Sequence, residues 1–279
     1  MYFKYDMKIG FIRDFYKFFL LIIITLAGCI WFDGILSSNI HANVINDNHS
    51  IINIYAFFFK GCAPRNANEQ KVFELPIIWL LFQSYLMFIL GRYPYSEMND
   101  NHGAFVLIKG KNKKCWYLSK CIWNGITVLS YYICSYGTIF IYGIIKGYSI
   151  NCKFATPIDD IALKSFVVPI EKIHTPGIIA LFLIPIIASF SLANIQLMVS
   201  TVASSVIGFV SSIIILVSSA FYMNVLLIGN MTMWGRFEYF LDGNIKPVIG
   251  IVIAFSFGLI SVIIGMNIFL HKDILIKDN

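Results

Sequence analysis

The sequence has little charge. Asp, Glu, Lys and Arg make up 13% of the 279 residues, while 58% are hydrophobic. An average soluble domain carries about 25% charged residues. A water-soluble fold cannot bury so much apolar surface, so the composition excludes an ordinary soluble domain and predicts a membrane protein.

The chain also lacks the usual patterns of metal, disulfide and phosphate chemistry. Its six cysteines form no C-x-x-C pair and its five histidines show no ligand spacing, so we expect neither a zinc site nor a dense disulfide framework. Only Cys62 and Cys152 fall in loops predicted on one side, where they are a disulfide pair or two free thiols. The phosphate-loop pattern GxxxxGK[ST] is missing, so this chain is not expected to bind ATP or another cofactor itself.

Long apolar runs are what the sequence does have. Runs of roughly 20 apolar residues can cross a bilayer as helices, and six candidates are found at 15–36, 74–91, 121–145, 177–199, 202–226 and 248–270. The predicted fold is therefore an all-α polytopic membrane protein with six transmembrane helices, forming a single domain over 1–279.

The predicted spans from residue 74 onward contain no Asp, Glu, Lys or Arg except Glu74 at an end. Transporters driven by ions usually place such residues within the membrane. No proton or sodium relay is therefore visible. If the protein performs driven transport, the energy has to come from another polypeptide.

The basic residues indicate an orientation. With the N-terminus in the cytoplasm, 12 of the 21 Lys and Arg residues lie on the inner side and 9 on the outer side. The densest group, from Lys109 to Lys120, is on the inner side, as the positive-inside rule expects. Both termini are therefore predicted to be cytoplasmic.

The break at 92–120 is predicted to be a cytoplasmic loop with its own helix. Pro94 disfavours helix at Tyr93 and in the turn before it, so the second span should end at about Arg92. Ser96 suits an N-cap, and Gly110 suits the position after a helix C-terminus. These signals predict a separate helix over 97–109.

Three other segments are too short or too polar to span. Residues 1–14 are predicted to lie on the cytoplasmic membrane surface. The apolar run 51–59 should pack at the interface or against the spans. Residues 223–247 are half apolar and rich in glycine, and fit either a re-entrant segment before the sixth span or an ordinary surface loop on the outer side.

This organisation resembles the membrane subunit of type-2 ATP-binding-cassette exporters. Over about 91–123 the chain is similar to small bacterial permeases of peptide and antimicrobial-peptide export or immunity systems. The residues that carry the similarity are Tyr93-Pro94, Glu97, Gly103, Leu107-Ile108-Lys109, Lys113-Lys114, Trp116 and Ser119-Lys120. Met98 stands where an Arg usually follows the acidic residue of the family.

The resemblance implies a coupling helix that sits in a groove of a cytoplasmic ATPase. It implies as partners two ATPase subunits, which bind ATP and Mg²⁺, a second permease copy or a related permease, and the lipids of a bacterial plasma membrane, but no nucleic acid. The implied coupling residues are Tyr93, Pro94, Glu97, Met98, Gly103, Phe105 and Lys109. Residues expected to contact anionic lipid or the ATPase are Lys111, Lys113, Lys114, Trp116 and Lys120.

Four polar side chains lie within predicted spans. They either form hydrogen bonds between packed helices or line a substrate path; they are Gln83, Asn124, Asn194 and Gln196.

The expected function is that of an exporter permease, which makes and breaks no bonds, with a substrate that is an amphipathic compound or a peptide. One rival is a non-catalytic immunity or scaffold protein that sequesters a toxic peptide. The other is an intramembrane enzyme, against which the lack of ionisable residues at membrane depth weighs.

Overall fold

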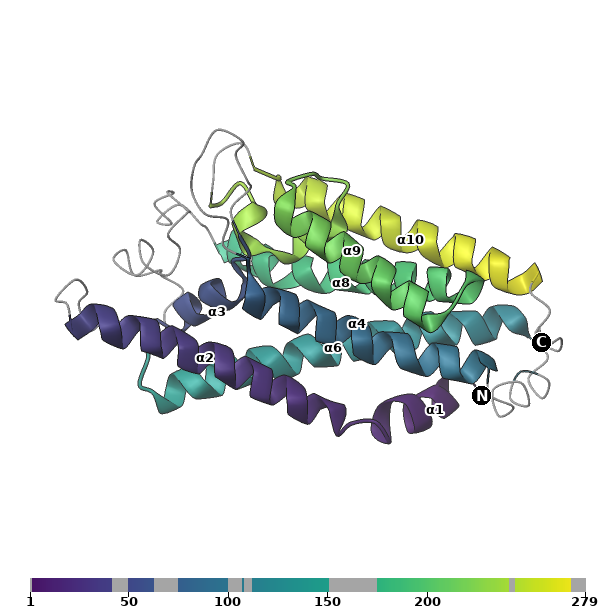
Figure 1. Ribbon diagram of the computed structural model, residues 1–279, viewed down its shortest axis with the longest axis horizontal. Helices are drawn as coiled ribbons and strands as arrows, with labels where there is room; N and C mark the ends of the chain where they lie inside the picture. Colours follow the sequence, from purple (N-terminus) through teal and green to yellow (C-terminus); the bar gives the residue numbers. More distant parts are fainter. Residues whose placement is uncertain are drawn as a thin grey trace.

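The computed structural model describes residues 2–41, 50–62, 75–99, 107, 112–150, 175–240 and 244–271, and these residues form a bundle of helices (Figure 1). The elements in chain order are α1 Tyr2–Asp6, the π-helix η1 Met7–Ile12, α2 Lys17–His41, α3 Ile51–Phe59, α4 Ile77–Asn99, α6 Lys113–Ile145, α8 Thr175–Val202, α9 Ser205–Phe221, the 3₁₀ helices η3 Ile228–Thr232 and η4 Trp234–Arg236, and α10 Pro247–His271.

Five of these helices are long and apolar enough to cross a membrane. They contain the candidate spans Lys17–Ser37, Ile77–Pro94, Lys113–Ile145, Gly177–Val202 and Pro247–His271. The fifth predicted span, 202–226, corresponds to α9, which has 17 residues and a length of about 25 Å, against a hydrocarbon layer of about 30 Å. The described residues are helical as predicted, and five of the six predicted spans coincide with helices that are long and apolar enough to cross a membrane.

The six long helices alternate in direction along the chain (Figure 1). As a result α1, the end of α4, the start of α6, the turn between α8 and α9 and the end of α10 lie together, and we call this the N-terminal end of the bundle. The stacked rings of Trp116 and Phe269 bring α6 and α10 together there. The opposite end carries α3, η3 and η4.

Small residues allow α8 and α10 to pack closely. Gly250, Ala254, Gly258 and Gly265 are buried along one side of α10. A Cβ atom at Gly258 would come within 2.7 Å of the Ser191 hydroxyl on α8. Such contacts between small residues are a common way for helices to pack inside membranes.

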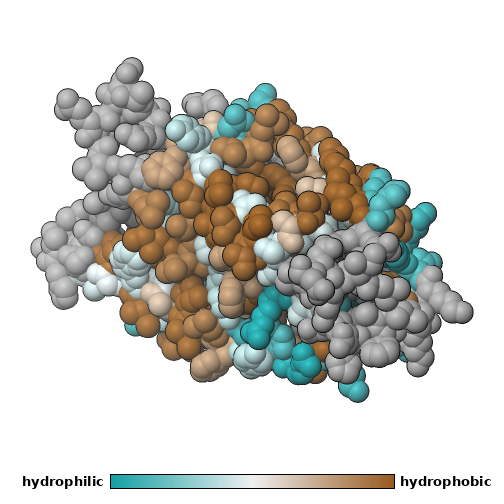
Figure 2. Space-filling view, turned by 45° about the vertical axis from the view of Figure 1, so that its right-hand side comes forward, coloured by the Kyte–Doolittle hydropathy of each residue, from teal (hydrophilic) through white to brown (hydrophobic). Residues whose placement is uncertain are grey.

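The surface of the bundle is largely apolar. Figure 2 shows hydrophobic residues over most of one face, with hydrophilic residues gathered toward its edges. On α10 alone, six large apolar side chains are 49–72% exposed: Val248, Val252, Phe255, Leu259, Ile260 and Ile263. An apolar surface of this extent is unfavourable in water and is what lipid or another membrane helix covers.

The apolar part of α4 ends at Pro94, close to the predicted Arg92, but the helix itself does not end there. Helix α4 continues through Pro94 to Asn99, and the Ser96 hydroxyl donates to the Tyr93 carbonyl of the same helix instead of capping a new one. Neighbouring helices can hold a proline inside a membrane helix, because they stabilise the turn that lost its hydrogen bond. Of the predicted helix 97–109, only the end of α4 and Leu107 are among the described residues.

The short apolar run is a buried helix, as predicted. Every residue of α3 is buried, and α3 packs against α2, α4 and α6. In the predicted outer loop, η3 and η4 are also buried. Helix η3 contacts α8, α9 and α10, and η4 contacts α3 and η3. This part of the loop therefore packs into the bundle rather than lying on its surface.

Candidate functional site

A buried polar cluster ties the chain together at the N-terminal end. Asp6, at the end of α1, accepts a hydrogen bond from the Tyr93 hydroxyl of α4 at 2.7 Å. It also accepts one from the Ser119 hydroxyl of α6 and forms an ion pair with the Lys120 ammonium. We call Asp6, Tyr93, Ser119 and Lys120 the Asp6 cluster. It joins three segments that are distant in the sequence.

The charges of the Asp6 cluster are well compensated. Asp6 and Lys120 are each 1% exposed, and burying two charges is favourable only with good geometry and further polar partners. The carboxylate receives three donors, as described above. The ammonium lies 4.5 Å from the Tyr93 ring centroid and 4.8 Å from that of Trp116, and both aromatic faces attract a cation.

A second set of contacts fixes the N-terminal segment, residues 2–16, to α4. The Tyr5 hydroxyl donates to Glu97 Oε1 at 3.4 Å. Burial, followed by the nearby Glu97 carboxylate, raises the pKa of Tyr5 to about 12. The backbone of Gly10 lies directly on the Tyr93 ring, where a Cβ would come within 2.5 Å of a ring carbon. Glycine is needed at position 10 because the N-terminal segment and α4 approach so closely.

The same segment also reaches the connection between α4 and α6. The Tyr2 hydroxyl donates to the Leu107 carbonyl at 3.5 Å and accepts from the Asn112 amide at 3.4 Å. In the same buried cluster as Tyr2, Trp116 of α6 stacks on Phe269 of α10 with ring centroids 4.8 Å apart. The start of α6 is thus held both by the N-terminal segment and by α10.

The predicted coupling residues divide into two groups. Tyr93, Pro94 and Glu97 are buried at the N-terminal end of the bundle, where Tyr93 and Glu97 contact the N-terminal segment. The side chain of Met98 and all of Gly103, Phe105 and Lys109 lie outside the described residues. The first group therefore forms the base of the connection rather than its outer surface.

The residues expected at lipid or the ATPase also differ among themselves. Lys114 is exposed, and the Lys113 ammonium donates to the Leu270 carbonyl of α10 at 3.3 Å. Lys111 lies outside the described residues. Burial overturns the expectation for Trp116, which is 2% exposed, and for Lys120, because a carboxylate and two aromatic rings from the chain itself surround the lysine.

Asp6 is the residue that sequence reasoning missed. Its only signal was an acid placed between Lys4 and Lys8, among the aromatic residues of the N-terminal segment. That segment was predicted to lie on the membrane surface. In the structure Tyr2, Asp6 and Gly10 face the protein, while Phe3, Lys4, Lys8 and Ile12 are exposed, so only the outward side can meet headgroups.

Two of the four polar residues within spans have packing roles. Gln83 donates to the Tyr132 hydroxyl at 2.8 Å and accepts from Ser189 at 3.2 Å, which joins α4, α6 and α8. Gln196 donates to the Met87 carbonyl at 2.9 Å. For these two residues the structure agrees with the packing interpretation.

Asn124 and Asn194 have incomplete hydrogen bonding. Both are buried, and the Oδ1 atom of each lacks a hydrogen bond. The amide nitrogen of Asn194 donates to Phe190 within its own helix. The contacts of these two residues are compatible with packing and with a substrate path, so the path remains a prediction for this pair.

Arg236 is a buried cation at the opposite end. Its Nη2 atom donates to the carbonyls of Ser219 and Ala220, at 3.3 and 2.9 Å, and so caps the C-terminal end of α9. Carbonyls at a helix C-terminus carry partial negative charge, which offsets part of the cost of burial. Burial lowers the pKa of Arg236 and raises that of the adjacent Cys62 thiol. Cys152, the suggested disulfide partner of Cys62, lies outside the described residues.

The described residues contain no group of three or more His, Cys, Asp or Glu side chains arranged to hold a metal ion. What the Asp6 cluster can do chemically is bind one segment of the chain to another through a buried ion pair. Comparisons with protein-family models, with curated proteins and with solved structures gave no match.

Proposed function

We propose that this chain is the permease subunit of an exporter driven by a separate cassette ATPase in the bacterial plasma membrane. The observation that supports this most is the construction of the N-terminal end. The connection between α4 and α6 has a base made of buried polar contacts. From α4 onward, the long apolar helices hold no Asp, Glu, Lys or Arg in their central turns.

In this proposal residues 100–111 contact the ATPase, and the base of this connection transmits force. Motion imposed on the connection would reach α4, α6 and the N-terminal segment together, because the Asp6 cluster and Tyr2 join these parts. Breaking the Asp6–Lys120 pair would leave an uncompensated buried charge. The last turn of α4, the start of α6 and the N-terminal segment are therefore expected to move as one unit.

The remaining elements of the proposal follow from the resemblance to type-2 exporters. Two ATPase subunits bind ATP and Mg²⁺ on the cytoplasmic side, where both termini of the chain lie. The permease pairs with a second copy or a related permease and alternates its interface between inward-open and outward-open states. The substrate is an amphipathic compound or a peptide, and α9 serves as the fifth of six spans.

An affinity pull-down from the native host tests the proposal. The detergent-solubilised protein is expected to bring with it a cassette ATPase, identified by mass spectrometry and by ATP hydrolysis in the eluate. Phe105→Asp, in the proposed contact surface, should reduce recovery at least tenfold. Tyr222→Asp is the matched control, because Tyr222 is a 70% exposed aromatic residue at the opposite end.

Recovery of no ATPase under mild detergent conditions would contradict the exporter proposal and would favour the immunity or scaffold function. Equal loss of the ATPase in Phe105→Asp and Tyr222→Asp would show that residues 100–111 are not the contact surface.

A further inference from the structure

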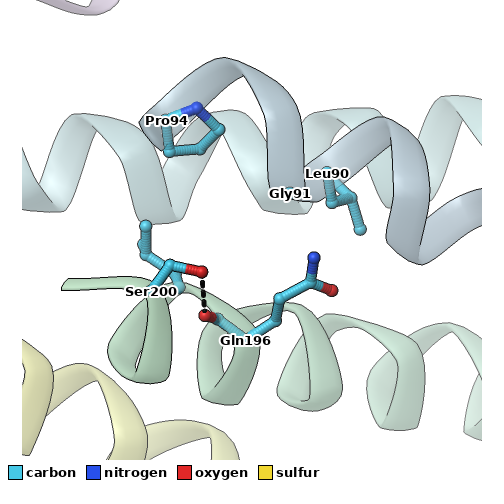
Figure 3. Close-up of a pocket in the computed structure, with 6 residues that line it drawn as sticks. Leu90, Gly91, Pro94, Gln196 and Ser200 are labelled. Atoms are coloured by element: carbon cyan, nitrogen blue, oxygen red, sulfur yellow. Dashed lines mark hydrogen bonds between the residues drawn. The ribbon is translucent and has the colours of Figure 1, made fainter. Parts of the chain in front are cut away.

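A small pocket lies between α4 and α8, just below the Asp6 cluster. Figure 3 shows the Gln196 amide pointing from α8 toward α4, and the Ser200 hydroxyl beside it on the same helix. The pocket has room for about one water molecule. Its lining residues are Leu90, Gly91, Pro94, Gln196, Leu197 and Ser200.

The α4 side of the pocket has a backbone acceptor without its helical donor. In an α-helix the Leu90 carbonyl would accept from the amide of residue 94, but Pro94 has no N–H. The first requirement of a water site, an acceptor that lacks its usual helical donor, is therefore met. Ordered water commonly satisfies backbone groups freed by proline in membrane helices.

The α8 side supplies the polar partners. Gln196 Nε2 donates one hydrogen to the Met87 carbonyl at 2.9 Å, which leaves its second N–H. The Ser200 hydroxyl donates to the Gln196 carbonyl at 2.7 Å, so its oxygen is available as an acceptor. A buried water molecule usually makes about three hydrogen bonds, and the two helices offer that number.

Gln196 also fixes the position of α4. Its Oε1 accepts from Ser212 of α9 at 3.3 Å, and its Nε2 atom lies where a Cβ of Gly91 would be, at 2.3 Å. The side chain thus links α9 and α8 to α4 just before Pro94. On the other side of Pro94, Glu97 is linked to the N-terminal segment through Tyr5.

We propose that the pocket binds one water molecule, and that this water together with Pro94 makes residues 91–94 of α4 a hinge. The water accepts from Gln196 and donates to the Leu90 carbonyl and to Ser200. Because water replaces a direct backbone bond, the turn at Pro94 can change its angle without losing all its hydrogen bonds. The last turn of α4 then tilts with the N-terminal segment, while Gln196 holds the span below.

The inference rests on the proposed function for its purpose, but the hinge itself can be tested without an ATPase. Hydrogen exchange of the purified protein in lipid nanodiscs, followed by mass spectrometry, measures how often the amides of 91–99 open. Pro94→Ala restores an N–H for the Leu90 carbonyl and should slow this exchange at least tenfold. Gln196→Leu removes the side chain that links α8 and α9 to α4 and should accelerate exchange at 91–99 at least tenfold.

Asn194→Leu is the matched control. It replaces a buried amide on the same helix whose amide nitrogen donates only within α8, and exchange at 91–99 should stay within twofold of the wild type. If Gln196→Leu does not fold, Ser212→Ala, which removes one hydrogen bond from Gln196, should accelerate exchange in its place.

Unchanged exchange in Pro94→Ala would overturn the hinge whether or not an ATPase is found. A structure at a resolution that shows ordered water should contain a water molecule within hydrogen-bond distance of Gln196 Nε2 and the Leu90 carbonyl. Absence of water there, with other buried waters visible, would overturn the water site. If the exchange data confirm the hinge but no ATPase is recovered, the proposed function is rejected and the hinge in α4 stands.

Discussion

Replacing Lys120 by methionine should detach the N-terminal segment from the bundle. The substitution keeps the length of the side chain but leaves the Asp6 carboxylate buried with only the hydroxyls of Tyr93 and Ser119 as donors. Removing one partner of a buried ion pair costs about 3–5 kcal/mol, and we take about 3 kcal/mol because two donors remain. Since 1.4 kcal/mol is tenfold, the undocked population should rise by roughly 100-fold.

Limited trypsin digestion measures that population. Cleavage after Lys8 and Arg13, which are exposed but lie in the folded N-terminal segment, requires local unfolding, so its rate follows the undocked fraction. Lys146→Met is the control, because Lys146 pairs with Asp33 at 3.1 Å but is half exposed. Exposed pairs contribute about 0–1 kcal/mol.

The double variant Asp6→Asn, Lys120→Met separates charge from packing. Removing both charges avoids an unpaired buried carboxylate, so the cleavage rate should return most of the way to the wild-type value. The reasoning is refuted if Lys120→Met changes the rate no more than Lys146→Met does, or if the double variant is cleaved as fast as the single one.

Three further outcomes are expected. A maleimide should label Cys115, which is exposed, much faster than Cys62, which is buried and whose pKa is raised by burial. Labelling of Cys115 in inside-out but not right-side-out vesicles would also establish the cytoplasmic location of the start of α6. Labelling only in right-side-out vesicles would contradict that orientation. The pKa of Tyr5 is 10 in the unfolded chain and about 12 in the folded one, so Tyr5 stabilises the fold fully below pH 10 and loses that contribution as the pH rises toward about 12. In unfolding measurements over this pH range, the stability advantage of the wild type over Tyr5→Phe should shrink. A constant advantage would disprove the linkage. Phe269→Ala removes the ring stacked on Trp116 and should lower the free energy of unfolding by about 3–5 kcal/mol. Thermal unfolding measures this loss, and a loss under 1 kcal/mol would contradict the packing.

The sequence predicted the bundle because long apolar runs carry that information locally. The helices at 17–41, 113–145 and 247–271 are recognisable from composition and length alone. The error at Pro94 arose because proline is normally a helix terminator. Packing of α4 against α8 and the N-terminal segment outweighed that local preference, and a sequence pattern does not contain those neighbours.

The site was less predictable than the fold. Tyr93, Glu97 and Lys120 were selected, but as an outward docking surface. Their burial depends on Asp6, which lies 114 residues from Lys120 in the chain. A lysine in a basic stretch and an acid near the N-terminus have no local feature that pairs them, because an ion pair depends on proximity in space and not on spacing in the sequence.

The sequence by itself determined that the chain forms apolar helices with little charge between their ends, since the cost of placing charge in hydrocarbon restricts composition directly. Only the tertiary structure decided that α4 passes through Pro94, that Gln196 links three helices and that Lys120 faces Asp6 rather than lipid. Those outcomes depend on which side chains meet after the helices pack. The free energy of a buried polar group is set by its partners in space, and not by its neighbours along the chain.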